Sequence, residues 1–474
     1  MMAGTIWARR KGLHDWKDYG EGRALRRTLG WPHLVALGVG AIVGTGIYTL
    51  IGIGAGKAGP AVIVSFALAG IVCACAALAY AELATMMPAA GSAYSYSYVA
   101  LGEPVAWVIG WSLILEYTLV CAAVAVGWSG YAIGFLNSWG IIIPPELAGG
   151  PHAGGIVNLP AIVITAAVTG LLVLGTRESA FVNTVLVIIK MTALALFVVL
   201  ALPAFDSANL VPFAPNGWGA VEAEGGKIGV AAAAAIIFFA FYGFDAVSTA
   251  AEEAKDPARD LTIGIIGSML ICTVVYMAVA AAAIGAMAVS DFAGSGEPLA
   301  HVLRSLGWPG PAQLIGVGAI VAMPTVLLAF MYGQSRIFFA IARDGLLPER
   351  LAGVSKRSGT PVLMTIVTGI VVAAISGLMK LDEIAALANS GTIAAFIAIA
   401  VSLVVLRRRA PNAERKFRVP AHLAVAAITI VGCLYFFTSL AASTQQWFFI
   451  WNAIGIGVYL LYGIRRSMIA RAAA

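Results

Sequence analysis

Four glycines crowd an apolar run near the start of the chain. Residues 38–48 read G-V-G-A-I-V-G-T-G-I-Y, and the glycines are Gly38, Gly40, Gly44 and Gly46. Each glycine destabilises a helix interior by about 1 kcal/mol relative to alanine. An interrupted helix frees backbone N–H and C=O groups, which can bind the charged groups of a ligand without any charged side chain. The stretch therefore predicts an unwound helix whose exposed backbone binds a ligand.

Two other structures are compatible with this glycine pattern. A GxGxxG-like phosphate loop must follow a strand in a βαβ unit, whereas this stretch lies in an apolar run. The spacing Gly40-x-x-x-Gly44 is also typical of a close helix-packing face. A second interrupted run favours binding: residues 238–245, F-F-A-F-Y-G-F-D, place a glycine and an aspartate inside an apolar stretch. Paired interrupted spans are the sequence pointer to a binding site at the bilayer midplane of a transporter.

One lysine lies deep within an apolar run. Lys190 is about ten residues into residues 179–202, which at 1.5 Å per residue places it ~15 Å from either end, near the bilayer centre. An ionisable group at that depth is a functional hypothesis by default. Burial favours the neutral amine over the ammonium, so we expect Lys190 to carry a coupled proton. A purely structural lysine is the alternative.

Carboxylates within apolar runs are the other candidates for chemistry. Glu116 lies in the run 104–136, where it would contact a ligand through water, accept a proton or pair with a helix end. Glu82 lies near the end of the run 61–87, where an interfacial position is the simpler interpretation. Five charged residues near the inner ends of two later runs predict either a cytoplasmic gate or a solvated rim: Asp245, Glu252, Glu253, Arg336 and Arg343.

The composition indicates which class of protein must position these residues. Of the 474 residues, 61% are hydrophobic and 11% are charged, whereas soluble domains carry about 25% charged and about 45–50% apolar residues. The sequence therefore predicts an all-α, polytopic protein embedded in the lipid bilayer. The five cysteines are scattered through apolar runs, and their spacing predicts neither a disulfide framework nor a metal site.

A helix needs about 20 apolar residues to cross the hydrocarbon core. By that measure the chain has about twelve spans, which are 33–55, 61–87, 104–136, 159–175, 179–202, 228–251, 261–288, 311–341, 361–379, 384–406, 421–441 and 447–465.

The basic residues predict the orientation of these spans. With a cytoplasmic N-terminus, 24 of the 29 Lys and Arg residues fall on the inner side, four fall outside and Lys190 lies within a span. This bias follows the positive-inside rule and places both termini in the cytoplasm. It also accounts for the net charge of +6 without a nucleic-acid partner. The first span is expected to be retained, because no signal-peptide core or cleavage site precedes it.

Several motifs, in the same order, resemble those of amino acid–polyamine–organocation transporters, and within them bacterial members of the cationic amino acid transporter branch. Besides residues 38–48 and 241–245, the matching stretches are A-Y-A-E-L-A-T-M-M-P-A-A-G-S-A-Y-S-Y-S-Y at 79–98, G-W-S-L-I-L-E-Y at 110–117, A-E-E-A-K-D-P at 251–257 and R-I-F-F-A-I-A-R-D-G-L-L-P at 336–348. The resemblance implies the LeuT-type fold, with two inverted five-helix repeats and two further helices. It also implies amino acid uptake across the plasma membrane, the inner membrane of a bacterium.

On this resemblance the chain divides into five parts. They are a cytoplasmic N-terminal tail (1–32), a first inverted repeat (33–202), a second inverted repeat (228–406), two further spans (421–465) and a cytoplasmic C-terminal tail (466–474).

The resemblance assigns roles at both interrupted runs. The backbone N–H groups of Thr45 and Gly46 are similar to those that hold the carboxylate of an amino acid. Phe239 resembles an aromatic lid over the occupied site, with ordinary core packing as the alternative. Four backbone carbonyls resemble those that hold the ammonium group: Ile42, Phe239, Ala240 and Tyr242.

Lys190 matches the position where sodium-coupled members of this fold bind a cation and where proton-dependent relatives place a lysine amine. When protonated, it is expected to donate to the carbonyls of Gly40 and Val43, and when neutral to release them. The resemblance thus implies coupling to H+ without any cofactor.

The side chains expected from the eighth span favour a neutral substrate. Ala322, Met323, Pro324 and Thr325 carry no charge, and only Glu116 offers a carboxylate to a cationic side chain. We therefore expect a proton-coupled importer of small or medium neutral L-amino acids that works by alternating access. An exchanger or facilitator of cationic amino acids without proton coupling is the alternative.

Other classes of protein fit the sequence less well. A channel needs a continuous ring of polar or charged groups, and an enzyme needs a nucleophile with a base or clustered histidines and carboxylates. Neither pattern is present, so the chain is not expected to be an enzyme. A sensor that binds amino acids stays open, as does the choice between a monomer and a complex with a small partner subunit.

Overall fold

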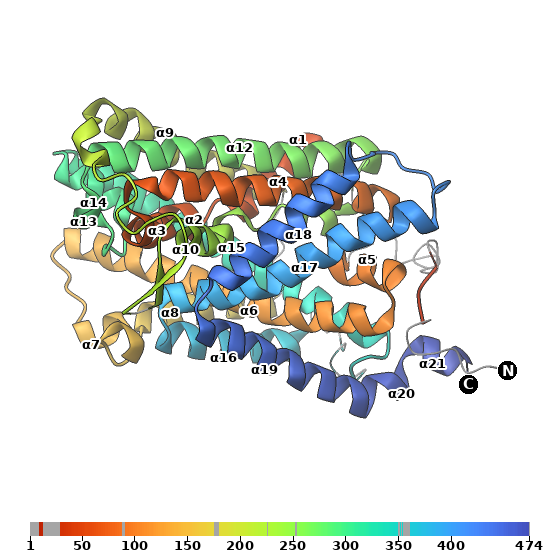
Figure 1. Ribbon diagram of the computed structural model, residues 1–474. Coiled ribbons are helices and arrows are strands. Elements are labelled where there is room, and N and C mark those ends of the chain that lie inside the picture. The colour runs from red at the N-terminus through yellow and green to blue at the C-terminus, as the bar shows by residue number, and fades with distance from the viewer. Residues whose placement is uncertain are drawn as a thin grey trace.

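Long apolar runs fold into helices that lie side by side in one bundle (Figure 1). The computed structural model describes residues 9–12, 29–87, 91–174, 180–224, 226–251, 254–348, 351, 353 and 361–473. These residues are nearly all helical. Two short strands within them, β1 (Val221–Ala223) and β2 (Gly226–Ile228), form an antiparallel pair in which Val221 is opposite Ile228.

Within the described ranges, nine helices or helix pairs are long and apolar enough to cross a membrane. Three shorter apolar helices accompany them: α1 (Trp31–Ile42), α8 (Leu159–Leu174) and α16 (Val362–Leu378). The longer uninterrupted helices are α4 (Val62–Met86), α6 (Glu103–Ser138), α9 (Ala180–Ala201), α12 (Pro257–Ala286), α15 (Pro309–Arg343), α17 (Leu381–Arg409), α18 (His422–Ser439) and α19 (Ala442–Val458). Every expected span therefore coincides with one helix or with a series of shorter ones, as the composition predicts.

The two runs predicted to be interrupted are interrupted. Their pieces, in chain order, are α1, α2 (Thr45–Tyr48) and α3 (Leu50–Ala58), and then α10 (Val230–Ile237), the 3-10 turn η6 (Phe238–Phe241) and α11 (Ala246–Thr249). Gly243 follows η6 with a φ of +111°, a backbone conformation that glycine adopts without steric cost. The glycines of both runs thus mark real breaks in the helices.

Short elements lie at both ends of the bundle. At one end are α7 (Pro145–Ala148), α13 (Val289–Phe292) and α14 (Pro298–Ser305), and at the other are α5 (Ser92–Ala100), α20 (Ile464–Arg466) and α21 (Met468–Ala473) (Figure 1). The remaining turns are the 3-10 segments η2 (Gly59–Ala61), η3 (Pro151–Ala153), η4 (Leu202–Ala204) and η5 (Ser207–Leu210) and a π-helical turn at Tyr459–Gly463.

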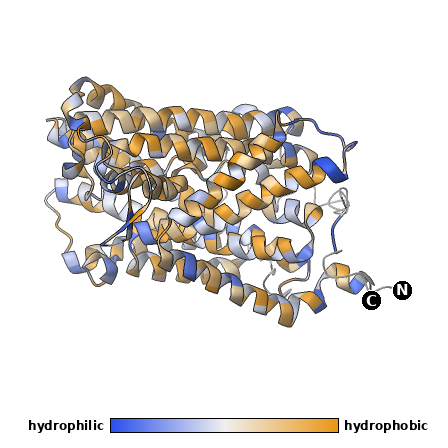
Figure 2. Cartoon of the chain, viewed as in Figure 1, coloured by the Kyte–Doolittle hydropathy of each residue, from blue (hydrophilic) through white to orange (hydrophobic). Residues whose placement is uncertain are grey.

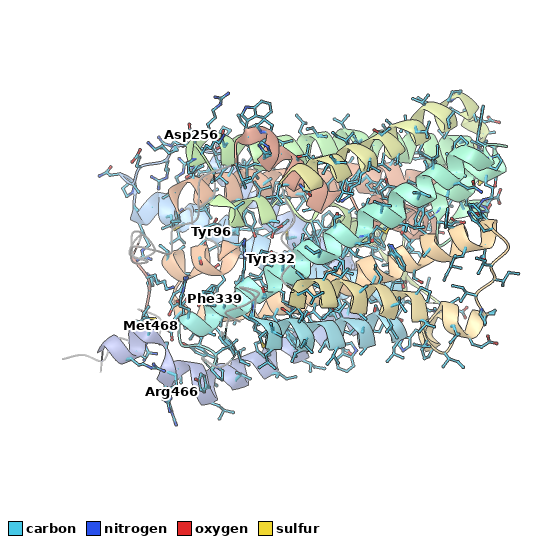
Figure 3. All side chains as sticks on the ribbon, turned by 180° about the vertical axis from the view of Figure 1, so that it is seen from behind. Tyr96, Asp256, Tyr332, Phe339, Arg466 and Met468 are labelled. Atoms are coloured by element: carbon cyan, nitrogen blue, oxygen red, sulfur yellow. The ribbon has the colours of Figure 1, made fainter. Side chains whose placement is uncertain are left out.

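The two ends of the described chain meet at one end of the bundle. The Arg9 guanidinium donates to the carbonyl of Ile464 at 2.8 Å, and the backbone N–H of Met468 donates to the carbonyl of Asp344 at 3.0 Å. Asp256, Arg466 and Met468 lie at this same end (Figure 3). An even number of crossings produces this arrangement. The assignment of this end to the cytoplasm stays a prediction.

The bundle buries its centre and exposes apolar side chains around its circumference. In α6, 89% of the most apolar stretch is buried inside the protein, whereas in the helix that begins with α19 the share is 17%. Hydrophobic residues cover the sides of the bundle in Figure 2, and hydrophilic residues gather toward its two ends. This distribution is the one that a bilayer requires, because lipid contacts the sides and water contacts the ends.

Glu82 is buried in an ion cluster and is not at an open interface. Its carboxylate accepts two hydrogen bonds from the Arg407 guanidinium at 2.7 and 2.6 Å and one from Arg415 at 3.1 Å. The backbone N–H of Val419 donates a further bond at 2.8 Å. The cluster ties the end of α4 to the end of α17 and to the segment that leads into α18.

We expect Glu82→Ala to destabilise the folded protein by about 3 kcal/mol, because it leaves buried arginine without its partner. The measurement is thermal unfolding of the purified protein in detergent. The matched control is Lys416→Met, since Lys416 is exposed and pairs with exposed Glu414. If Glu82→Ala unfolds at the same temperature as the wild type, the ion cluster contributes little to the stability of the folded protein.

Candidate binding site between the two interrupted helices

The two breaks lie against each other, and each presents a glycine to the backbone of the other. A Cβ atom added at Gly46 would come within 2.3 Å of the Cα of Ala240. A Cβ added at Gly243 would come within 2.6 Å of the backbone carbon of Ala41. Both distances are shorter than any real contact, so this crossing requires residues without side chains.

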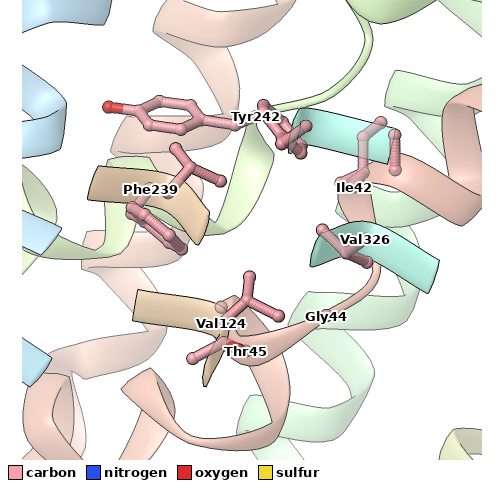
Figure 4. Close-up of a pocket in the computed structure, with 11 residues that line it drawn as sticks. Ile42, Gly44, Thr45, Val124, Phe239, Tyr242 and Val326 are labelled. Carbon is pink, nitrogen blue, oxygen red and sulfur yellow. The ribbon is translucent and has the colours of Figure 1, made fainter. Parts of the chain in front are cut away.

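A small cavity lies at this crossing. Residues from both breaks, from α6 and from α15 line it: Ala41, Ile42, Gly44, Thr45, Gly46, Val120, Val124, Phe239, Tyr242, Val326 and Phe330. Figure 4 shows Ile42, Val124, Phe239 and Val326 around the opening. Its volume is about 10 Å³, room for about one water molecule. An amino acid therefore requires the lining side chains to move apart.

The sequence-predicted site residues at the breaks come together here. Ile42, Thr45, Gly46, Phe239 and Tyr242 all line the cavity. Ala240 lies directly behind it, against Gly46. Their assigned roles toward carboxylate and ammonium stay predictions.

The carbonyl of Ile42 already accepts a hydrogen bond, from the hydroxyl of Tyr276 at 2.9 Å. A carbonyl oxygen has two lone pairs, so this contact leaves one for a ligand. The hydroxyl also fixes the direction of the carbonyl at the end of α1, which orders the break before any ligand binds.

The side-chain part of the cavity comes from residues that the sequence does not single out. Val120 and Val124 on α6, and Val326 and Phe330 on α15, are pairs four residues apart, and each pair faces the cavity. Of the neighbouring residues expected to line it, Met323 instead accepts a hydrogen bond from the Thr45 hydroxyl at 3.8 Å. The i, i+4 spacing is a usable signal, but only once the rotation of each helix is known.

Glu116 is not among the residues that line the cavity. It lies one turn before Val120 on α6, is 2% exposed and packs against Gly391 of α17, where an added Cβ would come within 3.0 Å of its Cβ. Its Oε2 has no hydrogen-bond partner among the described residues. Direct contact between Glu116 and a substrate in the cavity stays a prediction.

Two of the charged residues predicted to form a gate, Asp245 and Arg336, contact other side chains. The Asp245 carboxylate accepts from the Tyr117 hydroxyl at 3.5 Å and from the backbone N–H of Gly243 at 3.2 Å. The Arg336 guanidinium donates to the Tyr332 hydroxyl at 2.7 Å. Glu252 and Glu253 lie outside the described residues.

Lys190 is completely buried and contacts the first break. Its Nζ donates to the carbonyl of Gly40 at 2.7 Å. The Lys190 carbonyl in turn accepts from the Tyr48 hydroxyl at 3.2 Å, so side chain and backbone of this residue both hold the interrupted helix. The expected bond to the carbonyl of Val43 stays a prediction.

Close packing of α9 on α1 supports this contact. A Cβ added at Gly40 would come within 3.0 Å of both Asn183 Oδ1 and Val187 Cγ2. Gly40 therefore allows α9 to approach closely enough for the lysine amine to reach the carbonyl.

A sequence profile described as amino acid permease matches residues 29–459. The chain belongs to the amino acid permease family. This family is part of the amino acid–polyamine–organocation superfamily, and its members are transporters, not enzymes. The bundle of apolar helices is consistent with the LeuT-type fold of this superfamily, and the permease is a multi-pass membrane protein.

Three relatives show where the permease stands within the family. It is 43% identical to the branched-chain amino acid permease BcaP of Bacillus subtilis, over 98% of this chain and 99% of the relative. It is 41% identical to the methylthioribose transporter of the same organism, over 97% and 98%. It is 37% identical to the vacuolar cationic amino acid transporter 2 of Arabidopsis thaliana, over 86% of this chain and 64% of the relative. The permease is therefore a bacterial-type amino acid transporter related to the cationic amino acid transporter branch.

Proposed function

We propose that this permease imports neutral L-amino acids with branched aliphatic side chains, by alternating access and together with protons. The observation that carries the proposal is the cavity at the crossing of the two breaks. Backbone from both breaks supplies the polar groups, and the lining side chains are apolar apart from Thr45 and Tyr242, whose hydroxyl points away from the cavity (Figure 4).

The backbone of the site suits the part that all amino acids share. In this proposal the N–H groups of Thr45 and Gly46 hold the carboxylate, and the carbonyls of Ile42, Phe239 and Tyr242 hold the ammonium. The carbonyl of Ala240 is a further acceptor for the ammonium group. No charged side chain is required, which is favourable in the bilayer interior because an unpaired charge there is costly.

The side chains of the site suit an aliphatic group. Val120, Val124 and Val326 supply branched surfaces, and Phe330 supplies an aromatic one. Burial of apolar surface contributes about 25 cal/mol per Å², so leucine, isoleucine and valine gain more from this lining than glycine or alanine does. The branched-chain substrate in the name of one relative agrees with this choice.

Two other substrates fit the lining less well. A cationic side chain would need a carboxylate, and the cavity is lined by none. Methylthioribose has no carboxylate or ammonium group for the two breaks, and Thr45 is the lining residue whose hydroxyl could bind the hydroxyls of this sugar. Both are useful comparison substrates.

Lys190 supplies the coupling in this proposal. The contact between the Lys190 amine and the carbonyl of Gly40 supports this role: in the proposal the protonated form holds the carbonyl and the neutral form releases it. The proton then passes to the cytoplasm with the amino acid. A cytoplasmic location of both termini and a position in the bacterial inner membrane complete the proposal.

The test is uptake into proteoliposomes, with and without an inward proton gradient. The panel is labelled L-leucine, L-valine, L-arginine and methylthioribose. We expect gradient-driven accumulation of leucine and valine and little arginine. If the protein instead exchanges arginine at a rate that does not depend on the gradient, it is an exchanger of cationic amino acids and the proposed function is wrong.

We expect Val326→Phe to raise the KM for L-leucine about tenfold, because overfilling a packed site costs about 1–3 kcal/mol. L-Alanine should be affected less, since its side chain is shorter. Competition of unlabelled amino acids with labelled leucine measures this. The control is Leu314→Phe, an exposed position on the same helix. If Val326→Phe raised the KM for leucine and for alanine equally, Val326 would lie outside the side-chain pocket.

A further inference from the structure

Asn389 connects the second break to the neighbouring helix α17. Its side chain is completely buried. The Nδ2 group donates to the carbonyls of Ala235 at 2.5 Å and of Ile236 at 3.2 Å, in the last turn of α10. Its Oδ1 accepts a hydrogen bond from the hydroxyl of Tyr242. One side chain thus holds residues on both sides of η6.

The chemistry of this position favours an amide. The regular pattern of hydrogen bonds in α10 ends near these carbonyls, because the chain tightens into the 3-10 turn η6. Buried carbonyls without a donor are unfavourable. Asparagine has two N–H donors and one acceptor oxygen in a fixed geometry, so it satisfies two carbonyls and one hydroxyl together.

These bonds act on the cavity through Tyr242. The ring of Tyr242 lines the cavity, while its hydroxyl points away from it (Figure 4). The Tyr242 ring packs against the rings of Phe239 and Phe238, with centroid distances of 5.2 and 5.6 Å. Phe239 lies between the two points that Asn389 holds, so its ring and its carbonyl are positioned from both sides.

The position of Asn389 is itself fixed by helix packing. Two residues further along α17, a Cβ added at Gly391 would come within 2.8 Å of the carbonyl oxygen of Ser112 on α6. This close approach holds α17 against α6 beside the break. Asn389 does not line the cavity, so it has no direct contact with a ligand there.

We propose that Asn389 is a positioning residue for substrate binding, which acts by holding Tyr242 and the end of α10 in the geometry that the amino acid recognises. The inference rests on the proposed function, because it takes the cavity to be the substrate site. Loss of the side chain is then expected to weaken binding more than turnover.

The experiment measures the Kd of L-leucine and of L-arginine, by ligand-induced thermal stabilisation of the purified protein, together with KM and Vmax of uptake. The variants are Asn389→Ala, Tyr242→Phe and the double variant. The control is Ser390→Ala, because the neighbouring Ser390 is also buried but donates within its own helix, to the carbonyl of Ala386.

We expect Asn389→Ala to raise the Kd for leucine about tenfold or more and Tyr242→Phe about fivefold, in line with the loss of buried hydrogen bonds. The KM should follow the Kd, and Vmax should change less than about twofold. The double variant should bind like Asn389→Ala, because the bond that Tyr242→Phe removes is already absent. Ser390→Ala should bind like the wild type.

Two outcomes separate this inference from the proposed function. If the wild type binds arginine and not leucine, the proposed substrate is wrong, and the variants are then compared by their Kd for arginine. An unchanged Kd in Tyr242→Phe, or additive effects in the double variant, overturns the role of Asn389. The Tyr242→Phe result decides the matter even where Asn389→Ala fails to fold.

Discussion

Lys190→Met is expected to abolish accumulation of L-leucine driven by an inward proton gradient, while leaving exchange of leucine across the membrane measurable. The lysine amine donates to the carbonyl of Gly40 at 2.7 Å from a completely buried position. Methionine fills a similar volume but neither donates nor binds a proton. A hydrogen bond from a charged donor contributes about 1.5–3 kcal/mol, so loss of the bond alone predicts at least about a tenfold fall in the gradient-driven rate.

The pH dependence has a defined sign. Only the protonated amine donates to Gly40 with a full charge, so wild-type uptake should rise as the outside pH falls. Lys190→Met should show no such rise. Uptake into proteoliposomes at several outside pH values, with the inside pH held constant, measures the difference.

Lys380→Met is the matched control, because Lys380 is exposed at the start of α17. It should keep both the rate and the pH dependence of the wild type. If Lys190→Met accumulates leucine with the same pH dependence as the wild type, the lysine is structural and the coupling proton travels elsewhere.

Gly46→Ala is expected to abolish binding of L-leucine, with a rise in Kd of about a hundredfold or more. The added methyl carbon would lie 2.3 Å from the Cα of Ala240, and because the backbone fixes the positions of both atoms, no side-chain rotation can separate them. The breaks must therefore separate, and overpacking of this kind costs about 1–3 kcal/mol or more. The groups assigned to carboxylate and ammonium then move apart together.

Gly56→Ala provides the comparison, because a Cβ there meets only the side chain of Ala293, at an ordinary 3.4 Å. This variant should bind leucine like the wild type. Thermal stabilisation by leucine measures both. Wild-type affinity in Gly46→Ala would mean that the substrate does not bind at the crossing of the breaks.

The sequence alone predicts the parts of this molecule that depend on local chemistry. Run length identifies the helices, since each must cross the same thickness of hydrocarbon. Glycine and aspartate inside apolar runs identify both breaks, because these residues disfavour a helix interior. The depth of Lys190 in its span marks it as unusual, and the resemblance to known transporters supplies its partner Gly40.

The side-chain pocket is harder to predict for a physical reason. Helix α6 is apolar on all sides, so its sequence carries no amphipathic pattern from which its rotation can be read. Val120 and Val124 look like any other valines in such a helix. The partners of Glu82 and Asn389 are equally hidden, since they lie 325 and 147 residues away in the chain. Contacts of that separation follow from packing and leave no local signal.

The reciprocal glycine contacts at the crossing of the breaks have a consequence for how this transporter changes over evolution. Helices that meet backbone to backbone leave no room for a side chain at Gly46 or Gly243, so the arrangement of the backbone proposed to bind the amino acid core tolerates no substitution there. The valines and the phenylalanine of α6 and α15 face the cavity from separate helices and are free to vary. If the proposed function holds, new substrate preferences can therefore arise by substitutions on two helices, while the backbone groups proposed to bind the common zwitterion stay the same.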